Sequence, residues 1–193
     1  MRLRYQFEIR DTKTGKLISK TRKRECRSFV IGFMKHLELF IGHPYSVDAN
    51  SVNVIDTTGA TRVVIHNTYA RYYGSVEAPG NEAIYGIVVG TGTTAVTTDD
   101  YAVETPIAHG SGSGQLNYGA TVVGGAVSAG SGCTLTISRQ FGNASGDTIT
   151  IRELCLVAQC MSAYEYLFSR DIVNQAVANG NTATAIIEIS TEL

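Results

Sequence analysis

The chain has 193 residues, 44% of them hydrophobic, which is enough to fold as one domain without disulfides or a structural metal. Only 17% are charged, and the abundance of glycine, threonine, serine, valine and alanine favours strands and tight turns over helices. No segment approaches the roughly 18–20 apolar residues of a membrane-spanning helix, and the start alternates arginine with apolar side chains, unlike a signal peptide. We therefore expect a protein that is made and folded in a cytoplasm.

The net charge of −1 conceals an uneven distribution. Residues 1–27 contain ten Lys or Arg and three acidic residues, so they carry +7 and the remainder carries −8. Opposite charges at two places favour head-to-tail association or docking on an acidic partner, and a solvated basic hairpin is the alternative. Nucleic-acid binding is disfavoured, because no aromatic-interleaved or zinc motif accompanies the charge. The docking residues that we expect are Arg2, Arg4, Lys20, Arg22, Lys23 and Arg24.

The first elements are predicted from apolar spacing. Residues 2–10 alternate apolar and polar side chains, which predicts a half-buried strand, and residues 16–22 can return as its hairpin partner. Residues 28–41 change to steps of three and four, and Ser28 is a suitable N-cap, so an amphipathic helix is predicted there. We expect its apolar stripe to pack on the first hairpin.

Beyond Pro44 the pattern is that of short strands separated by turns, such as those at residues 143–147 and 179–180. The fold class predicted is mainly β: a β-sandwich or jelly-roll-like domain with one N-terminal amphipathic helix. We expect a single domain over residues 1–193, with the basic hairpin and helix in residues 1–42 and the sandwich in residues 50–193. The later strands predicted are 52–55, 61–67, 83–89, 120–129, 133–141, 148–158, 166–173 and 182–190.

The four cysteines and four histidines show no spacing typical of a metal site. Cys133 and Cys155 lie inside apolar stretches, so we expect the cysteines to be buried free thiols. The sequence predicts neither a metal nor a cofactor.

Residues 90–95 read Gly-x-Gly-x-x-Ala directly after an apolar run, which is the pattern of a dinucleotide-binding turn. Such a site needs a helix whose N-terminus faces the pyrophosphate. Residues 93–98 are instead Thr-Thr-Ala-Val-Thr-Thr, rich in β-branched residues and poor in helix formers. We therefore interpret Gly90 and Gly92 as framework glycines that let the strand turn sharply into an extended segment.

Asp99 and Asp100 are the remaining candidates for chemistry in this stretch. Adjacent residues point apart on a strand, and no EF-hand spacing surrounds them, so a carboxylate pair or calcium site is disfavoured. We interpret them as turn carboxylates, one of which caps a short turn before Tyr101. No nucleophile elbow or P-loop occurs, so we predict a protein without enzymatic activity.

Residues 86–110, from Gly-Ile-Val-Val-Gly-Thr-Gly through Ala-His-Gly, resemble a stretch of the virion structural proteins of tailed bacteriophages. The similarity continues through residues 139–146 (Arg-Gln-Phe-Gly-Asn-Ala-Ser-Gly) and the apolar strand of residues 149–157. Residues 168–173 and 177–182 resemble the closing hairpin of that family. This chain departs from the family pattern after the glutamate, where Leu-Cys-Leu replaces the expected Gly-Leu pair.

The resemblance implies a role in assembly and no catalytic residues. The expected function is a capsid decoration or cement protein, located in the virion, that self-associates and docks on the capsid. Its expected partners are further copies of itself, with a trimer among the candidate forms, and the major capsid protein or tail proteins, with no membrane. The alternative is a tail or fibre component whose sandwich binds a glycan or receptor. Its candidate stacking platforms are Tyr69, Tyr72, Tyr73, Tyr101, Tyr164 and Tyr166.

Overall fold

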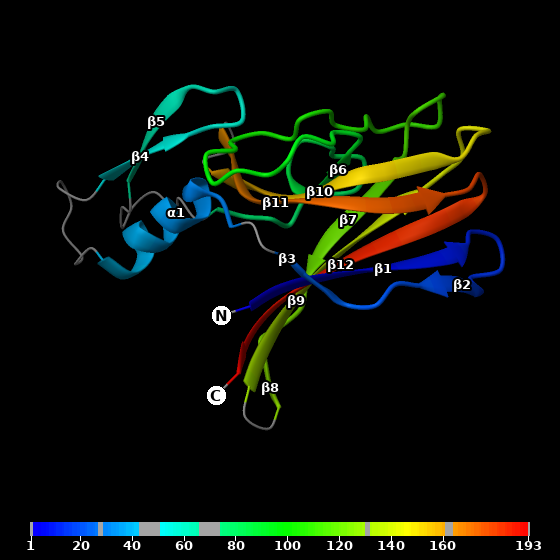
Figure 1. The fold of residues 1–193 in the computed structure, drawn as a ribbon, viewed down its shortest axis with the longest axis horizontal. Coiled ribbons are helices and arrows are strands. Elements are labelled where there is room, and N and C mark those ends of the chain that lie inside the picture. Colours follow the sequence, from blue (N-terminus) through cyan, green and yellow to red (C-terminus); the bar gives the residue numbers. More distant parts are fainter. Residues whose placement is uncertain are drawn as a thin grey trace.

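The computed structural model describes residues 2–26, 29–42, 51–65, 74–129, 132–160 and 164–192. These residues form two antiparallel sheets that face each other, a small two-stranded sheet and one helix (Figure 1). The mainly β, sandwich-like class predicted from the sequence is therefore confirmed, together with its helix near the N-terminus.

The larger sheet contains the first and last strands of the chain. Its order is β2-β1-β12-β9-β7, with β3 beside β1 and β8 beside β9. All of its neighbouring strands are antiparallel. Its strands are β1 (Arg2–Asp11), β2 (Leu17–Lys20), β3 (Arg24–Cys26), β7 (Asn117–Val123), β8 (Val127–Ala129), β9 (Gly132–Gly142) and β12 (Asn181–Glu192).

The smaller sheet has the order β11-β10-β6, formed by β6 (Gly86–Gly90), β10 (Ile149–Cys160) and β11 (Tyr164–Val177). One apolar cluster fills the space between the two sheets. Phe7 and Phe141 enter it from the larger sheet, and Ile151 and Leu154 enter it from the smaller one. Burial of each such side chain stabilises the fold by about 1.5–3 kcal/mol, so this layer is the main core.

Strand β1 is an interior strand of the sandwich. It pairs with β12 along its whole length, from Arg2 opposite Ser190 to Asp11 opposite Asn181. The period-two alternation predicted from the sequence explains this position, because the apolar side chains from Leu3 onward fill the core while the alternate residues face outward. The basic hairpin therefore cannot be removed without removing part of the core.

Helix α1 (Ile31–Gly42) begins later than predicted, and the expected N-cap Ser28 lies outside the described residues. The expectation that it packs on the first hairpin is wrong. The Phe33 ring instead meets the Phe168 ring of β11 edge-on, with 5.5 Å between centroids. The reason is that the apolar face of β1 is already covered by the smaller sheet, whereas Phe168 of β11 is only partly buried by the two apolar clusters and is covered further by the helix.

A two-stranded sheet of β4 (Ser51–Ile55) and β5 (Thr61–Ile65) lies beside the helix (Figure 1). Its inward valines form a second, smaller cluster with Tyr166 and Cys160 of the smaller main sheet. Its turn is held by Asp56, whose carboxylate accepts hydrogen bonds from Thr58, Ala60 and Arg62. The turn thereby brings residues 57 and 58 to the outer side of the smaller sheet.

The lengths of several strands differ from the prediction. Strand β11 continues to Val177, well past the predicted end at residue 173, and the expected strand 83–89 begins only at Gly86. The predicted strand 120–129 is divided into β7 and β8. The turns predicted at residues 143–147 and 179–180 are present, and the Asn143 side-chain amide joins them by donating to the Val177 carbonyl at 2.7 Å.

Arg139 is a buried cation at the centre of the larger sheet. Its position on β9 is one that alternation assigns to the core, and its guanidinium lies 4.8 Å from the centre of the Tyr118 ring. Burial lowers the pKa of this guanidinium, and five backbone carbonyls take up its hydrogen bonds. The acceptors are the carbonyl oxygens of Pro79, Glu82, Tyr85, Ile87 and Gly119.

Replacement of this cation tests its role in the fold. The substitution Arg139→Met keeps an apolar stem but leaves the five carbonyls without their donor, so the free energy of unfolding should fall by more than about 3 kcal/mol. Urea denaturation measures this change. The matched control is Arg152→Met at an exposed position, where a change within about 0.5 kcal/mol is expected. Equal effects of the two substitutions would contradict the role of Arg139.

Candidate functional site

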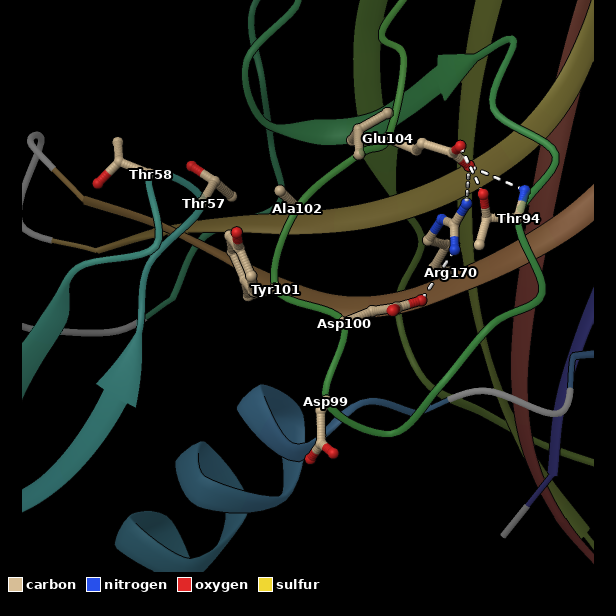
Figure 2. Close-up of a pocket in the computed structure, with 10 residues that line it drawn as sticks. Thr57, Thr58, Thr94, Asp99, Asp100, Tyr101, Ala102, Glu104 and Arg170 are labelled. Atoms are coloured by element: carbon tan, nitrogen blue, oxygen red, sulfur yellow. Dashed lines mark hydrogen bonds and ion pairs between the residues drawn. The ribbon is translucent and has the colours of Figure 1, made fainter.

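The loop of residues 91–105 follows β6 and crosses the outer face of the smaller sheet (Figure 2). Glu153 of β10 points from that face into the loop and is fully buried. Its carboxylate accepts backbone amide hydrogen bonds from Gly92 at 3.2 Å, Glu104 at 3.1 Å and Thr105 at 2.8 Å. The Gly92 amide of the glycine turn therefore does bind an anion, together with two amides from the end of the loop, and that anion is a carboxylate of the same chain.

Arg170 of β11 provides the opposite charge. Its Nε donates to Glu153 at 2.9 Å. Its Nη1 donates to Asp100 at 2.9 Å, and its Nη2 donates to Glu104 at 2.6 Å (Figure 2). Burial acts to lower the pKa of Arg170, but the hydrogen bonds to Glu153 and Asp100 raise it overall. One charged guanidinium thus connects the sheet to two positions in the second half of the loop.

The two loop carboxylates are also held from within the loop. Burial acts to raise the pKa of Asp100, but hydrogen bonds from Arg170 and Thr97 bring it below its usual value. The Thr94 hydroxyl and amide donate to Glu104, at 2.7 and 3.0 Å, and lower the pKa of that carboxyl as well. Both groups are therefore ionised at neutral pH, and the loop has a fixed conformation.

Gly90 and Gly92 are framework glycines for a reason other than the one predicted. Neither backbone lies in the left-handed region, so the sharp turn does not require glycine. A Cβ on Gly90 would overlap the Glu153 carboxylate, and one on Gly92 would lie 2.6 Å from Glu104 Oε2 and 2.7 Å from Glu153 Oε1. The missing side chains make room for two carboxylates.

The two aspartates of the predicted framework turn have different surroundings. Asp100 accepts hydrogen bonds from the Thr97 hydroxyl at 2.8 Å and amide at 3.2 Å, as a turn-capping residue does, and it also binds Arg170. Asp99 is exposed and points away from Arg170 (Figure 2). The sequence pattern therefore located a real turn but missed Glu153 and Arg170, which hold it.

Two neighbouring cavities flank the loop. The first, of about 450 Å³, is polar and is bordered by the acidic residues of the loop and by Arg170. The second, of about 220 Å³, is bordered mainly by Ala83, Ile84, Val88, Pro106 and Val157. The residues common to both are Thr57, Ala102 and Val103.

The predicted docking residues do not lie at this loop, because they belong to the larger sheet. Lys23 and Arg4 pair with Glu188 of β12, at 2.5 and 3.9 Å, and Lys20 pairs with Glu8 at 2.9 Å. Arg2 also lies on β1, and the exposed Arg22 and Arg24 lie before and within β3. The structure thus brings the basic residues together on one hairpin surface.

The tyrosines proposed as stacking platforms divide into three groups. Tyr101 is 45% exposed at the rim of the polar cavity. Tyr164 lies under the Arg62 guanidinium at 4.4 Å, and Tyr166 is buried in the core, where it cannot stack on a ligand. The remaining three, Tyr69, Tyr72 and Tyr73, lie outside the described residues.

The expected burial of the cysteines holds for Cys155 and Cys160, whereas Cys133 is exposed near the end of the larger sheet. Cys160 lies 3.5 Å from Nε2 of His36, whose Nδ1 lies 2.8 Å from the Gly32 carbonyl oxygen. Burial raises the pKa of the Cys160 thiol to about 12, so it stays protonated at neutral pH. This pair has the environment of a core contact and not that of an activated nucleophile.

Comparisons with protein-family models, curated proteins and solved structures gave no match. Among the described residues, no helix combines the length and the apolar character needed to cross a membrane. The functional argument therefore depends on the acidic loop and the basic hairpin.

The first test of the loop removes the buried negative charge. Glu153→Gln keeps the shape of the side chain but leaves the buried Arg170 with one charge partner fewer, and places an amide group before three backbone donors. We expect the free energy of unfolding to fall by about 3 kcal/mol, measured by urea denaturation. Glu77→Gln at an exposed site is the matched control, and a similarly small effect of both changes would contradict the role of Glu153.

The second test is the dependence of stability on pH. The folded-state pKa values of Asp100 and Glu104 lie below their usual 3.8 and 4.5. Their contribution to the free energy of unfolding is therefore complete above the usual pKa values and is lost as the pH falls through the lowered folded-state pKa values. Between about pH 6 and about pH 2, the double variant Asp100→Asn, Glu104→Gln should lose less stability than the wild type. Parallel pH profiles of the two proteins would refute this.

Proposed function

We propose that this protein is a non-enzymatic structural component of a bacteriophage virion, a capsid decoration or cement protein that self-associates and docks on the capsid. Its support from the sequence is the resemblance of residues 86–110 and 139–182 to virion structural proteins. The structural observation that carries the proposal is the basic hairpin surface. This surface consists of the cations of residues 2–24 and the carboxylates beside them.

The hairpin surface has a large surplus of positive charge. Nine cations accompany four carboxylates, which leaves five formal positive charges. Such a surface attracts an acidic partner over a distance of about 8 Å at physiological salt. The cations are Arg2, Arg4, Arg10, Lys13, Lys16, Lys20, Arg22, Lys23 and Arg24, and the carboxylates are Glu8, Asp11, Glu25 and Glu188.

The interior charges support a structural role. Glu153 and Arg170 bind each other and the loop, and Arg139 binds backbone carbonyls. A general acid, base or nucleophile needs a group that can change its protonation or bonding during the reaction. These three residues are instead fixed by several hydrogen bonds each, as expected for a rigid scaffold.

A tail or fibre component that binds a glycan or receptor is the second candidate. The half-exposed ring of Tyr101 favours it, because it lies at a polar cavity beside Asp99 and the Thr58 side chain. Aromatic rings stack on apolar faces of ligands, while carboxylates accept hydrogen bonds from hydroxyl groups. Binding to host envelope extract that is lost in Tyr101→Ala would favour this candidate over capsid decoration.

The proposed function is tested on purified particles. Imaging with a label on this protein should place it on the capsid, and its absence from particles would contradict the virion proposal.

The anchor is tested with the quadruple variant Lys13→Ser, Lys16→Ser, Arg22→Ser, Arg24→Ser, because deletion of β1 would disrupt the core. Occupancy should fall at least about tenfold, since the attraction to an acidic surface is removed. Arg152→Ser is the control, and normal occupancy of the quadruple variant would exclude the hairpin as the anchor.

A further inference from the structure

We propose that strand β2 of one copy docks on the two cavities beside the acidic loop of a second copy. Leu17 and Ile18 would cover the apolar cavity, while Lys16 and Lys20 would face the carboxylates. This contact rests on the proposed function in one respect, since it specifies the surface through which the protein self-associates.

The donor strand is unusually apolar for an exposed edge. All four residues of β2 are exposed, including Leu17 at 43% and Ile18 at 54%. Edge strands are commonly protected by charge, and here Lys16 and Lys20 flank the apolar pair. The strand therefore presents two apolar side chains between two cations.

The acceptor surface has the complementary arrangement. The apolar cavity has Ile84, which is 60% exposed, at its wall, and the polar cavity has Asp99, Asp100 and Glu104 at its wall. Ala102 and Val103 belong to both cavities, so the apolar and acidic parts lie side by side. Association would bury apolar surface on both partners, which is the favourable term that charge alone does not supply.

The charges of the two surfaces are opposite. At the loop, Asp100, Glu104 and Glu153 bind Arg170, and the exposed Asp99 lies beside them. These four carboxylates and the Arg170 guanidinium leave three formal negative charges. The hairpin surface carries a surplus of five positive charges. Copies would therefore attract each other in this orientation and repel each other when two hairpins or two loops meet.

The contact must form between different copies. β2 is hydrogen-bonded to β1 of the larger sheet, whereas the acidic loop covers the outer face of the smaller sheet (Figure 1). The core between the sheets separates the two surfaces within one molecule. Two different surfaces in contact make a heterologous interface, which gives a closed ring or an open chain of subunits.

A charge exchange in the purified full chain tests this contact. Lys16→Glu and Asp99→Lys both change exposed side chains, and circular dichroism verifies that each variant folds. Sedimentation velocity from about 10 µM to about 1 mM should show association of the wild type at about 50 mM salt that weakens at about 500 mM. Each variant alone should associate at least about tenfold more weakly. An equimolar mixture of the two should recover a heterodimer, because their altered charges attract.

Two further variants complete the test. Ile18→Ser should also weaken association, because it removes an apolar contact without a change in charge, whereas Glu77→Lys should have no effect. The contact is contradicted if the single variants associate like the wild type, if the mixture recovers nothing, or if the wild type stays monomeric throughout. None of these results contradicts the proposed virion role, which is tested by the presence of the protein on particles. The two proposals can therefore be refuted independently.

Discussion

The buried ion pair between Glu153 and Arg170 is the interaction on which the outer surface of the smaller sheet depends. Arg170 lies opposite Cys155 on the neighbouring strand and diagonal to Glu153, so the register of β10 and β11 sets their approach. Loss of Arg170 would leave the buried Glu153 carboxylate without its charge partner, and loss of Glu153 would leave Arg170 with only the two loop carboxylates. The pair in turn orders the loop of residues 91–105, and the loop forms the walls of both cavities.

The same pair explains why the glycine pattern resembles a dinucleotide-binding turn. Closely spaced glycines expose backbone amides and allow an anion to approach them, whatever the origin of that anion. In this protein the anion is the carboxylate of Glu153, which lies 61 residues after Gly92. The pattern in the sequence therefore describes a local geometry, and the ligand of that geometry is determined by the tertiary fold.

Local patterning predicted much of the sandwich, because alternation in β1, β9 and β12 identifies the side chains that face the core. It did not predict the partner of α1, since that depends on which apolar faces remain uncovered after the sheets assemble. The loop anchors Glu153 and Arg170 were missed because the pairing register of β10 and β11 brings them together, and local patterning does not give that register. Arg139 did give a signal, as a cation at a core position of an alternating strand.

The central claim is that the carboxylate of Glu153 holds the loop of residues 91–105 by hydrogen bonds to three of its backbone amides. Hydrogen exchange of the wild-type protein, followed by NMR, tests it most directly. The amides of Gly92, Glu104 and Thr105 should exchange as slowly as those of the core strands, because they open only when the ion pair breaks. Rapid exchange of these three amides, at the rate of an exposed loop, would contradict the account.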